Sequence, residues 1–118
     1  MDHTRPPILR TARVTRDFND EVKVAIDDAI VDLVGSKVLV SVYQHLRIQY
    51  DISGLEVPYR LDTLLEVLGN VFGIVGARTI ERTIAKRLYS RLGLDFYDAH
   101  SYRLEDYLEQ AKKELAQR

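Results

Sequence analysis

Apolar residues recur at intervals of three and four along most of this chain, which is the spacing that places them on one side of an α-helix. Five segments show the pattern: 20–33, 37–50, 60–72, 77–92 and 102–116. The short connections between them favour antiparallel neighbours. The pattern therefore predicts an all-α fold, a compact bundle of about five helices preceded by an extended basic N-terminal leader. We expect residues 18–118 to form a single helical domain and residues 1–17 to form the leader.

The most regular of these patterns follows Gly76 and predicts a helix with two different sides. The apolar side consists of Ala77, Ile80, Ile84, Leu88 and Leu92. The opposite side of the helical wheel gathers Arg78, Arg82, Lys86 and Tyr89. Gly93 is suited to end this helix, because glycine adopts the left-handed conformation at little cost. We expect the core of the domain to include Leu46, Leu68, Ile84 and Leu88.

The segment 37–50 is apolar on nearly every side of the helical wheel. Its β-branched run between Val38 and Val42 would also fit a buried strand. We favour a helix, because Gln44 and Gln49 carry the segment well past the usual length of a strand. A helix that is apolar nearly all round is typical of the centre of a bundle. We therefore predict that the other helices pack around this one.

Cap-forming residues and glycines mark the expected ends of the helices. Asn19 would cap the first helix and Gly35 would end it. Ser36 would then cap the second helix, and Ser101 would cap the last one. Residues 51–58 contain a glycine and a proline and predict a loop.

The leader differs in charge from the rest of the chain. Its four arginines are Arg5, Arg10, Arg13 and Arg16, and before residue 17 only Asp2 opposes them. The pair Pro6-Pro7 argues against a regular helix there. The leader is then either a solvated, flexible segment or a basic arm that clamps a partner or a phosphate backbone. Its apolar residues would also allow it to lie on a neighbouring subunit as an extended strand.

Composition changes this picture mainly by exclusion. The chain has 118 residues, a formal net charge of −1 and no cysteine. The lack of cysteine excludes disulfides and cysteine-ligated metals, and it suits a cytoplasmic protein. A net charge close to zero does not indicate a nucleic-acid or membrane partner. We see no signal peptide, and no apolar run approaches the ~20 residues that a membrane span needs.

The residues that could carry chemistry do not form a catalytic motif. The best cluster of metal-ligating types is Asp95, Asp98 and His100, which a polar loop before a helix explains better. The three glycines between residues 69 and 76 match neither the dinucleotide fingerprint nor the phosphate-binding loop. No serine has a convincing histidine partner for nucleophilic catalysis. We therefore expect a non-enzymatic protein without a metal or a cofactor.

The basic side of the predicted helix 77–92 leaves two functions open. A DNA-binding protein would use the residues Arg78, Arg82, Lys86 and Tyr89 together with Arg10, Arg13 and Arg16 of the leader. A protein-interaction module would instead set this basic face against acidic surfaces such as the first helix. The net charge favours the interaction module, whereas two separate basic segments on a small chain favour DNA binding.

Several short motifs occur in an order that resembles a known family. They are Y-x-x-L at 43–46, Tyr-Asp-Ile at 50–52, Val-Pro at 57–58, L-G-x-x-F-G at 68–73, G-A-x-x-I-E at 76–81 and L-Y-x-x-L-G-L at 88–94. Over about residues 20–115 this order is similar to the Nitrosopumilus-type output domain of thaumarchaeal and crenarchaeal proteins. The chain departs from that pattern by two extra residues, Ile74 and Val75, in the glycine turn. The resemblance implies an archaeal, cytoplasmic, helical regulatory domain, and it brings no catalytic residues to transfer.

We also expect the chain to associate with itself. The segment 37–50 has more apolar surface than one small bundle readily buries, and the leader contains apolar residues without an evident place in the core. We predict a homodimer and a protein partner, with nucleic acid as the alternative partner and no membrane.

Overall fold

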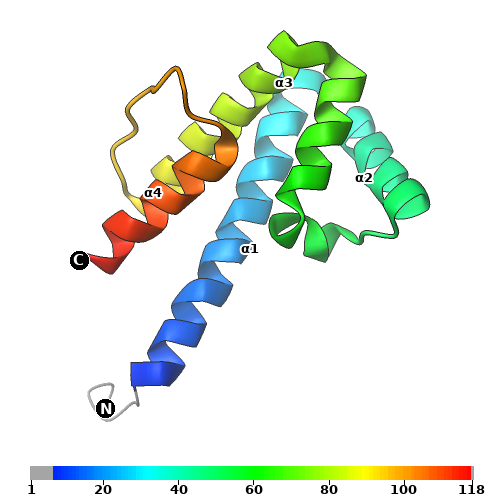
Figure 1. The fold of residues 1–118 in the computed structure, drawn as a ribbon. Coiled ribbons are helices and arrows are strands. Elements are labelled where there is room, and N and C mark those ends of the chain that lie inside the picture. Colours follow the sequence, from blue (N-terminus) through cyan, green and yellow to red (C-terminus); the bar gives the residue numbers. More distant parts are fainter. Residues whose placement is uncertain (1–6, 118) are drawn as a thin grey trace.

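The computed structural model describes residues 7–117, with side chains described from residue 18 onward. The elements in chain order are α1 (Pro7–Val34), α2 (Ser36–Tyr50), the 3-10 helix η2 (Gly54–Tyr59), α3 (Leu61–Leu92) and α4 (Leu104–Ala116) (Figure 1). No strand occurs among these residues, so the predicted all-α fold is confirmed.

The helices α1 and α3 build the centre of the molecule. They share the most extensive contact of any two elements, and α1 lies between the two halves of α3 in Figure 1. Ala25 and Ala29 of α1 and Ala85 of α3 are fully buried, and such small residues let helix axes approach closely. The four residues expected in the core are all buried: Leu46, Leu68, Ile84 and Leu88.

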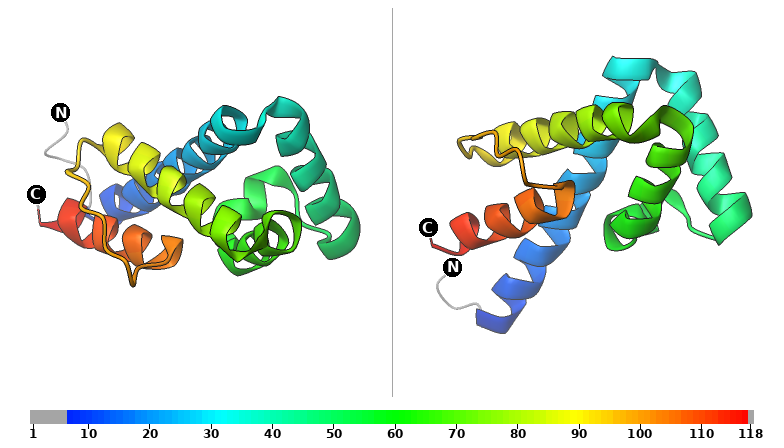
Figure 2. Two further views of the ribbon diagram at one scale, coloured as in Figure 1. Left: turned by 90° about the horizontal axis from the view of Figure 1, so that it is seen from above. Right: turned by 45° about the horizontal axis from the view of Figure 1, so that its top comes forward.

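The prediction that the other helices pack around the segment 37–50 was wrong. This segment forms α2, which lies at one side of the α1–α3 pair (Figure 2). Only Val42 and Leu46 of α2 are fully buried, while Val40 and Ile48 are mostly exposed. The physical reason is that α1 and α3 already fill the centre against each other. That packing leaves α2 with one face to bury, whatever the composition of its other faces.

A single residue bends α3 sharply. Gly73 has φ 76° and ψ 174°, whereas the residues on both sides are helical. Positive φ at this point favours glycine, because a Cβ would make the conformation costly. The two predicted helices 60–72 and 77–92 are therefore present, but the turn between them is shorter than expected. Residues 74–92, here called the C-terminal half of α3, continue as helix directly after the bend.

The start of the first helix was also predicted wrongly. Helix α1 begins at Pro7 rather than near Asn19, so residues 7–17 of the predicted leader are helical. Proline is well suited to the first position of a helix, because its missing N–H has no partner to lose there and its φ is preset. The backbone at Arg10, Arg13 and Arg16 is thus part of α1, and their side chains lie outside the described ones. Residues 1–6 lie outside the described residues altogether.

The expected ends of the remaining elements were met in part. Gly35 ends α1 as predicted, with φ 98°, but Ser36 is the first residue of α2 and caps nothing through its side chain. The predicted loop 51–58 contains η2, where the Ser53 N–H donates to Glu56 Oε1 at 3.0 Å. Helix α4 is capped at Arg103 rather than at Ser101, for a reason given below.

The length and apolar composition of α3 differ from what the sequence analysis led us to expect, namely that no apolar run approaches the length of a membrane span. By length and composition alone, this one described helix is long and apolar enough to cross a membrane. The same features occur in core helices, and many of its apolar residues, Leu64, Leu68, Ile84 and Leu88 among them, are buried within this fold. The bend at Gly73 also interrupts its straight length.

Candidate functional site

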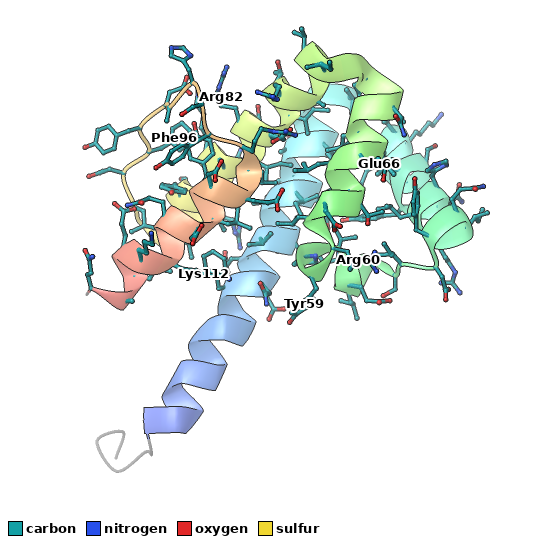
Figure 3. All side chains as sticks on the ribbon, in the orientation of Figure 1. Tyr59, Arg60, Glu66, Arg82, Phe96 and Lys112 are labelled. Carbon is teal, nitrogen blue, oxygen red and sulfur yellow. The ribbon has the colours of Figure 1, made fainter. Side chains whose placement is uncertain are left out.

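The candidate site is the outer surface of the C-terminal half of α3 together with the loop of residues 93–103, here called the α3–α4 loop. Arg78, Arg82 and Lys86 follow one another at four-residue intervals on this half-helix, and all three are exposed. Figure 3 labels Arg82 on α3 and Phe96 on the adjacent loop. The structure therefore brings the three predicted basic residues together on one accessible line.

Carboxylates of the same chain neutralise much of the basic charge of this half-helix. Arg82 Nε lies 3.3 Å from Asp98 Oδ1 of the α3–α4 loop. Arg91 Nε donates to Glu21 Oε2 of α1 at 2.5 Å, and this hydrogen bond raises the pKa of the Arg91 guanidinium. Arg87 forms an ion pair with Asp32, also on α1. Acidic residues of the first helix therefore lie across the far end of the basic helix.

Two basic residues of the line keep no carboxylate partner. Arg78 and Lys86 form no ion pair with any residue in the part of the chain that the structure describes. Lys86 Nζ instead lies 5.9 Å from the centroid of the Phe96 ring, which places a cation near an aromatic face. The unpaired positive charge of this surface is consequently concentrated at Arg78 and Lys86.

Tyr89 does not belong to this exposed surface, and its assignment to the basic face was wrong. Only 3% of the residue is exposed, and its hydroxyl donates to the Tyr107 carbonyl oxygen at 2.7 Å. Its ring packs edge-on against Phe96. Burial raises the pKa of the Tyr89 hydroxyl to about 12. The helical wheel missed this because the α3–α4 loop and α4 cover a second face of the half-helix, next to the predicted apolar one.

Glu81 is the most consequential residue that sequence reasoning missed. Its carboxylate is 3% exposed and accepts hydrogen bonds from Arg103 Nε at 2.9 Å and Nη2 at 2.8 Å. It also accepts the backbone N–H of Leu104, at 3.1 Å, which is one of the free N–H groups at the start of α4. A side chain of α3 thus helps to fix where α4 begins, together with Asp106, whose carboxylate accepts the Arg103 N–H at 2.9 Å. The cap residue is Arg103 and not Ser101. The sequence did contain a signal for the burial of Glu81. Glu81 precedes Ala85 by four residues and Tyr89 by eight, so the three share one helix face, and all three are buried.

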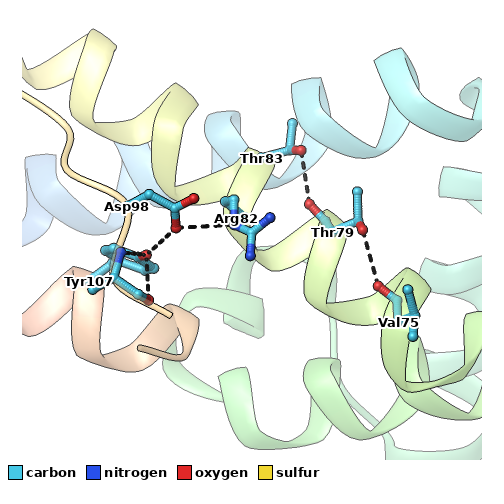
Figure 4. A network of polar contacts seen from close by, with 7 residues as sticks. Val75, Thr79, Arg82, Thr83, Asp98 and Tyr107 are labelled. Carbon is cyan, nitrogen blue, oxygen red and sulfur yellow. Dashed lines mark hydrogen bonds and ion pairs between the residues drawn. The ribbon is translucent and has the colours of Figure 1, made fainter. Parts of the chain in front are cut away.

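Tyr107 holds the α3–α4 loop against the helices. Its hydroxyl accepts the Ala99 N–H at 2.9 Å, and the Ala99 carbonyl oxygen lies 3.1 Å from the same hydroxyl. Asp98 Oδ1 is 3.3 Å away and also meets Arg82 (Figure 4). Because Asp98 is shared between Arg82 and Tyr107, this loop is tied both to α3 and to α4. Asp95, Asp98 and His100 form no metal-binding group: among the described side chains, those of residues 18–117, no three ligands of suitable type come together.

A small pocket opens between α3 and this loop. Its lining residues are Arg78, Glu81, Arg82, Ala99, His100, Tyr102 and Tyr107. The space between these residues is about 290 Å³ when open solvent is included, so the enclosed part is much smaller. Arg78, which has no carboxylate partner among the described residues, is part of this lining.

The acidic face predicted for the first helix is also partly occupied by internal contacts. Asp27 accepts a hydrogen bond from Lys23 Nζ at 2.8 Å and another from the Tyr43 hydroxyl. Burial and the neighbouring carboxylate raise the pKa of Tyr43 well above its usual value. This network attaches α2 to α1, so Asp27 is a structural residue rather than a solvated one.

The bend of α3 carries apolar side chains that the fold does not cover. Val71, Ile74 and Val75 surround Gly73 and are 57%, 77% and 81% exposed. We call these three residues the kink patch. Val71 lies two residues before the bend, and Ile74 and Val75 are the first two residues after it. Adjacent exposed apolar residues of this kind are typical of surfaces that meet another molecule.

No protein-family model, curated protein sequence or solved structure matches this chain.

Proposed function

We propose that this protein is a non-catalytic regulatory module that acts by binding protein partners, and that its first partner is a second copy of the chain. The observation that carries the proposal is the kink patch, where Ile74 and Val75 are more than three-quarters exposed. Leaving such side chains in water costs free energy that an interface would recover, at about 25 cal/mol for each Å² buried. A homodimer is the simplest assembly that covers the patch, because a two-fold axis brings the same surface of two chains together.

The charges of the C-terminal half of α3 support an interaction module over a DNA-binding surface. Arg82, Arg87 and Arg91 are each paired with a carboxylate of the same chain. Phosphate binding draws its strength from cations that are available to neutralise the backbone, and paired arginines contribute less. The formal net charge of −1 points the same way.

The resemblance to the archaeal output domain agrees with this proposal. It would make the protein a cytoplasmic regulatory domain without catalytic residues. The two residues by which the chain departs from that pattern, Ile74 and Val75, are the most exposed members of the kink patch. The departure therefore coincides with the surface to which we assign the interaction.

The proposal is tested by measuring the mass of the protein in solution with and without the patch. Sedimentation of the natural chain at micromolar concentration should show a dimer, and Ile74→Gln should shift it toward the monomer. Glutamine removes apolar surface without placing a new charge near Arg78. Ile48→Gln is the matched control, since Ile48 is equally apolar and 75% exposed but lies on α2. A monomer at all concentrations, or an equal loss of dimer in both variants, would contradict the assignment.

DNA binding is the second candidate, because Arg78 and Lys86 have no carboxylate partner in the described part of the chain. In addition, the described helix α1 extends beyond the other helices at its N-terminal end (Figure 1). That end includes the backbone of Arg10, Arg13 and Arg16. In this case duplex DNA should bind with an affinity that falls linearly on a log–log plot against salt. Arg82→Ala and deletion of residues 1–16 should each make the slope shallower. Absence of binding at ~50 mM salt, where phosphate contacts are strong, would eliminate this candidate.

A further inference from the structure

The pocket between α3 and the α3–α4 loop gathers cationic and hydrogen-bonding groups from two elements. Arg78 and Arg82 come from successive turns of α3, and His100 and Tyr102 come from the loop. The lining is predominantly polar, and its space reaches about 290 Å³ only when open solvent is included. The enclosed part is therefore too small for a drug-sized ligand or a nucleobase with its sugar, and it suits a small group. Several donors around a small space indicate a ligand that presents several acceptors.

The charges around the pocket leave a positive excess at Arg78. Glu81 is on the lining, but its carboxylate is already bound by Arg103 through two hydrogen bonds and by the Leu104 N–H. Asp98 is engaged by Arg82 and Tyr107. Arg78 has no such partner among the described residues and remains available. An arginine in this situation favours an oxyanion, because its planar guanidinium matches two oxygen atoms at once.

We propose that this pocket binds a phosphate-type oxyanion, either as the free ion or as the terminal phosphoryl group of a small phosphomonoester. Arg78 supplies the main contact and His100 and Tyr102 supply further donors. Arg82 contributes a further contact when the anion displaces Asp98 from the Arg82 guanidinium. The site goes beyond the proposed interaction function, since its lining excludes all three residues of the kink patch.

This binding would act on the α3–α4 loop. Arg82 and Asp98 form one of the contacts that tie the loop to α3, and an anion competing for Arg82 would weaken that contact. Tyr107 would still hold Ala99 through its hydroxyl. The anion would thus shift the loop's attachment to α3 from the Arg82–Asp98 contact toward the bound ligand.

The test is a calorimetric or NMR titration of the full chain at constant ionic strength, with inorganic phosphate in one arm and glycerol phosphate in the other. We expect saturable binding that Arg78→Gln weakens by about ten-fold or more, the loss of one charge-assisted contact. Arg47→Gln is the matched control, an exposed arginine on α2, and should leave the affinity unchanged. Both are surface positions without a carboxylate partner among the described side chains, so circular dichroism should show an intact fold.

A third variant probes the competition directly. Asp98→Asn removes the carboxylate that competes for Arg82 and should tighten phosphate binding several-fold. A preference for phosphate over the ester would identify the free ion, and the reverse a phosphorylated compound. The proposal is overturned if neither probe binds by tens of millimolar, if Arg47→Gln weakens binding as much as Arg78→Gln, or if Asp98→Asn reduces the affinity. A dimer lost in Ile74→Gln with phosphate binding intact would separate this site from the proposed function.

Discussion

Helix α2 and the C-terminal half of α3 differ in burial in a way that their compositions do not predict. The apolar helix α2 lies at the side of the molecule, and the basic half of α3 lies at its centre. α2 is apolar nearly all round but buries only Val42 and Leu46 completely. The C-terminal half of α3 is rich in arginine and lysine, yet seven of its residues are buried: Ala77, Ile80, Glu81, Ile84, Ala85, Leu88 and Tyr89. The number of faces that neighbouring elements cover therefore matters more for burial than the apolar content of a helix.

The neighbours of each helix account for this difference. The C-terminal half of α3 is bounded by α1 on one face and by α4 with the α3–α4 loop on another (Figure 2). The second of these faces contains polar groups, and each finds a partner: Glu81 binds Arg103, and Tyr89 binds the Tyr107 carbonyl. Buried polar groups are tolerated when they are hydrogen-bonded in this way. α2 meets both α1 and α3, but its buried residues Val42 and Leu46 lie on one side of the helix, and Ile48 stays exposed.

The difference between the two helices should be largest in the free energy of unfolding when one side chain of each helix is replaced by alanine. Leu88→Ala in α3 removes a fully buried side chain and should lower the free energy of unfolding by ~2–5 kcal/mol, from lost burial and the cavity left behind. Ile48→Ala in α2 should change it by less than ~0.5 kcal/mol, because the side chain is mostly exposed. Urea unfolding of the two variants measures both. Equal losses would mean that α2 is covered by another molecule, or that Leu88 is not packed.

Replacement of Glu81 should give the second largest loss of stability. Glu81 links α3 to the start of α4 through hydrogen bonds rather than by filling space in the core. Glu81→Ala removes the acceptor of two Arg103 hydrogen bonds and of the Leu104 N–H, which should cost ~2–3 kcal/mol. Arg103 is partly exposed and can be hydrated once it is released, which limits the loss. Glu81→Gln keeps one acceptor for the Leu104 N–H and should lose less. Urea unfolding combined with hydrogen exchange at the start of α4 would detect both effects.

A double-mutant cycle with Arg103→Gln isolates the pair itself. If Glu81→Ala costs the same in the presence and in the absence of Arg103, the carboxylate does not act through this partner. Selective loss of protection in α4 would agree with its role in starting that helix.

The spacing of apolar residues was enough to predict where the helices are, but not how deeply each helix is buried. It located four of the five predicted segments well, and it found the core positions Leu46, Leu68, Ile84 and Leu88. A helical wheel records which residues share a face, and it does not record how many faces will meet a neighbour. Tyr89 was assigned to the surface for this reason, and α2 was assigned to the centre.

The boundaries that were missed depend on contacts between distant residues or on local backbone choices. The start of α4 has a local capping contact, in which Asp106 accepts the Arg103 N–H, and a distant one from Glu81, over twenty residues earlier in the chain, which no local capping rule contains. The start of α1 depends on whether Pro7 ends an extended segment or opens a helix, and both are compatible with proline. In the candidate site, Arg78, Arg82 and Lys86 were predictable from their spacing, whereas Asp98 and His100 reach them only through the path of the loop.

Tyr89→Phe should produce a smaller effect with a distinctive pH dependence. Loss of the hydrogen bond to the Tyr107 carbonyl should cost ~1 kcal/mol at neutral pH. Burial raises the folded-state pKa of Tyr89 to about 12, above the ~10 of an exposed tyrosine. The unfolded chain therefore loses this proton first as the pH rises. The stability that the neutral hydroxyl provides is complete below pH ~10 and declines from there through pH ~12.

Urea unfolding at pH 9 and pH 11 measures this decline. The natural chain should lose more stability between the two values than Tyr89→Phe, because phenylalanine cannot ionise. Comparing the two proteins at the same two pH values isolates the contribution that depends on the Tyr89 hydroxyl. Parallel declines would indicate that the Tyr89 hydroxyl is not buried against α4.

The smallest expected effect is that of Asp32→Asn, which releases Arg87 from its ion pair between α1 and α3. Both side chains are nearly half exposed, and exposed pairs contribute only about 0–1 kcal/mol, so unfolding in urea should hardly change. The variant is informative because it leaves Arg87 without its carboxylate partner and so raises the available positive charge of the basic helix. If paired carboxylates are what keeps this helix from binding DNA, Asp32→Asn should increase duplex binding at ~50 mM salt and steepen its salt dependence by up to about one phosphate contact. If the helix meets protein partners instead, the variant should leave DNA binding absent. Increased binding without any loss of stability would move the preference toward the nucleic-acid function, because the chain's own acidic helix would then be acting as a competitor for the same arginines.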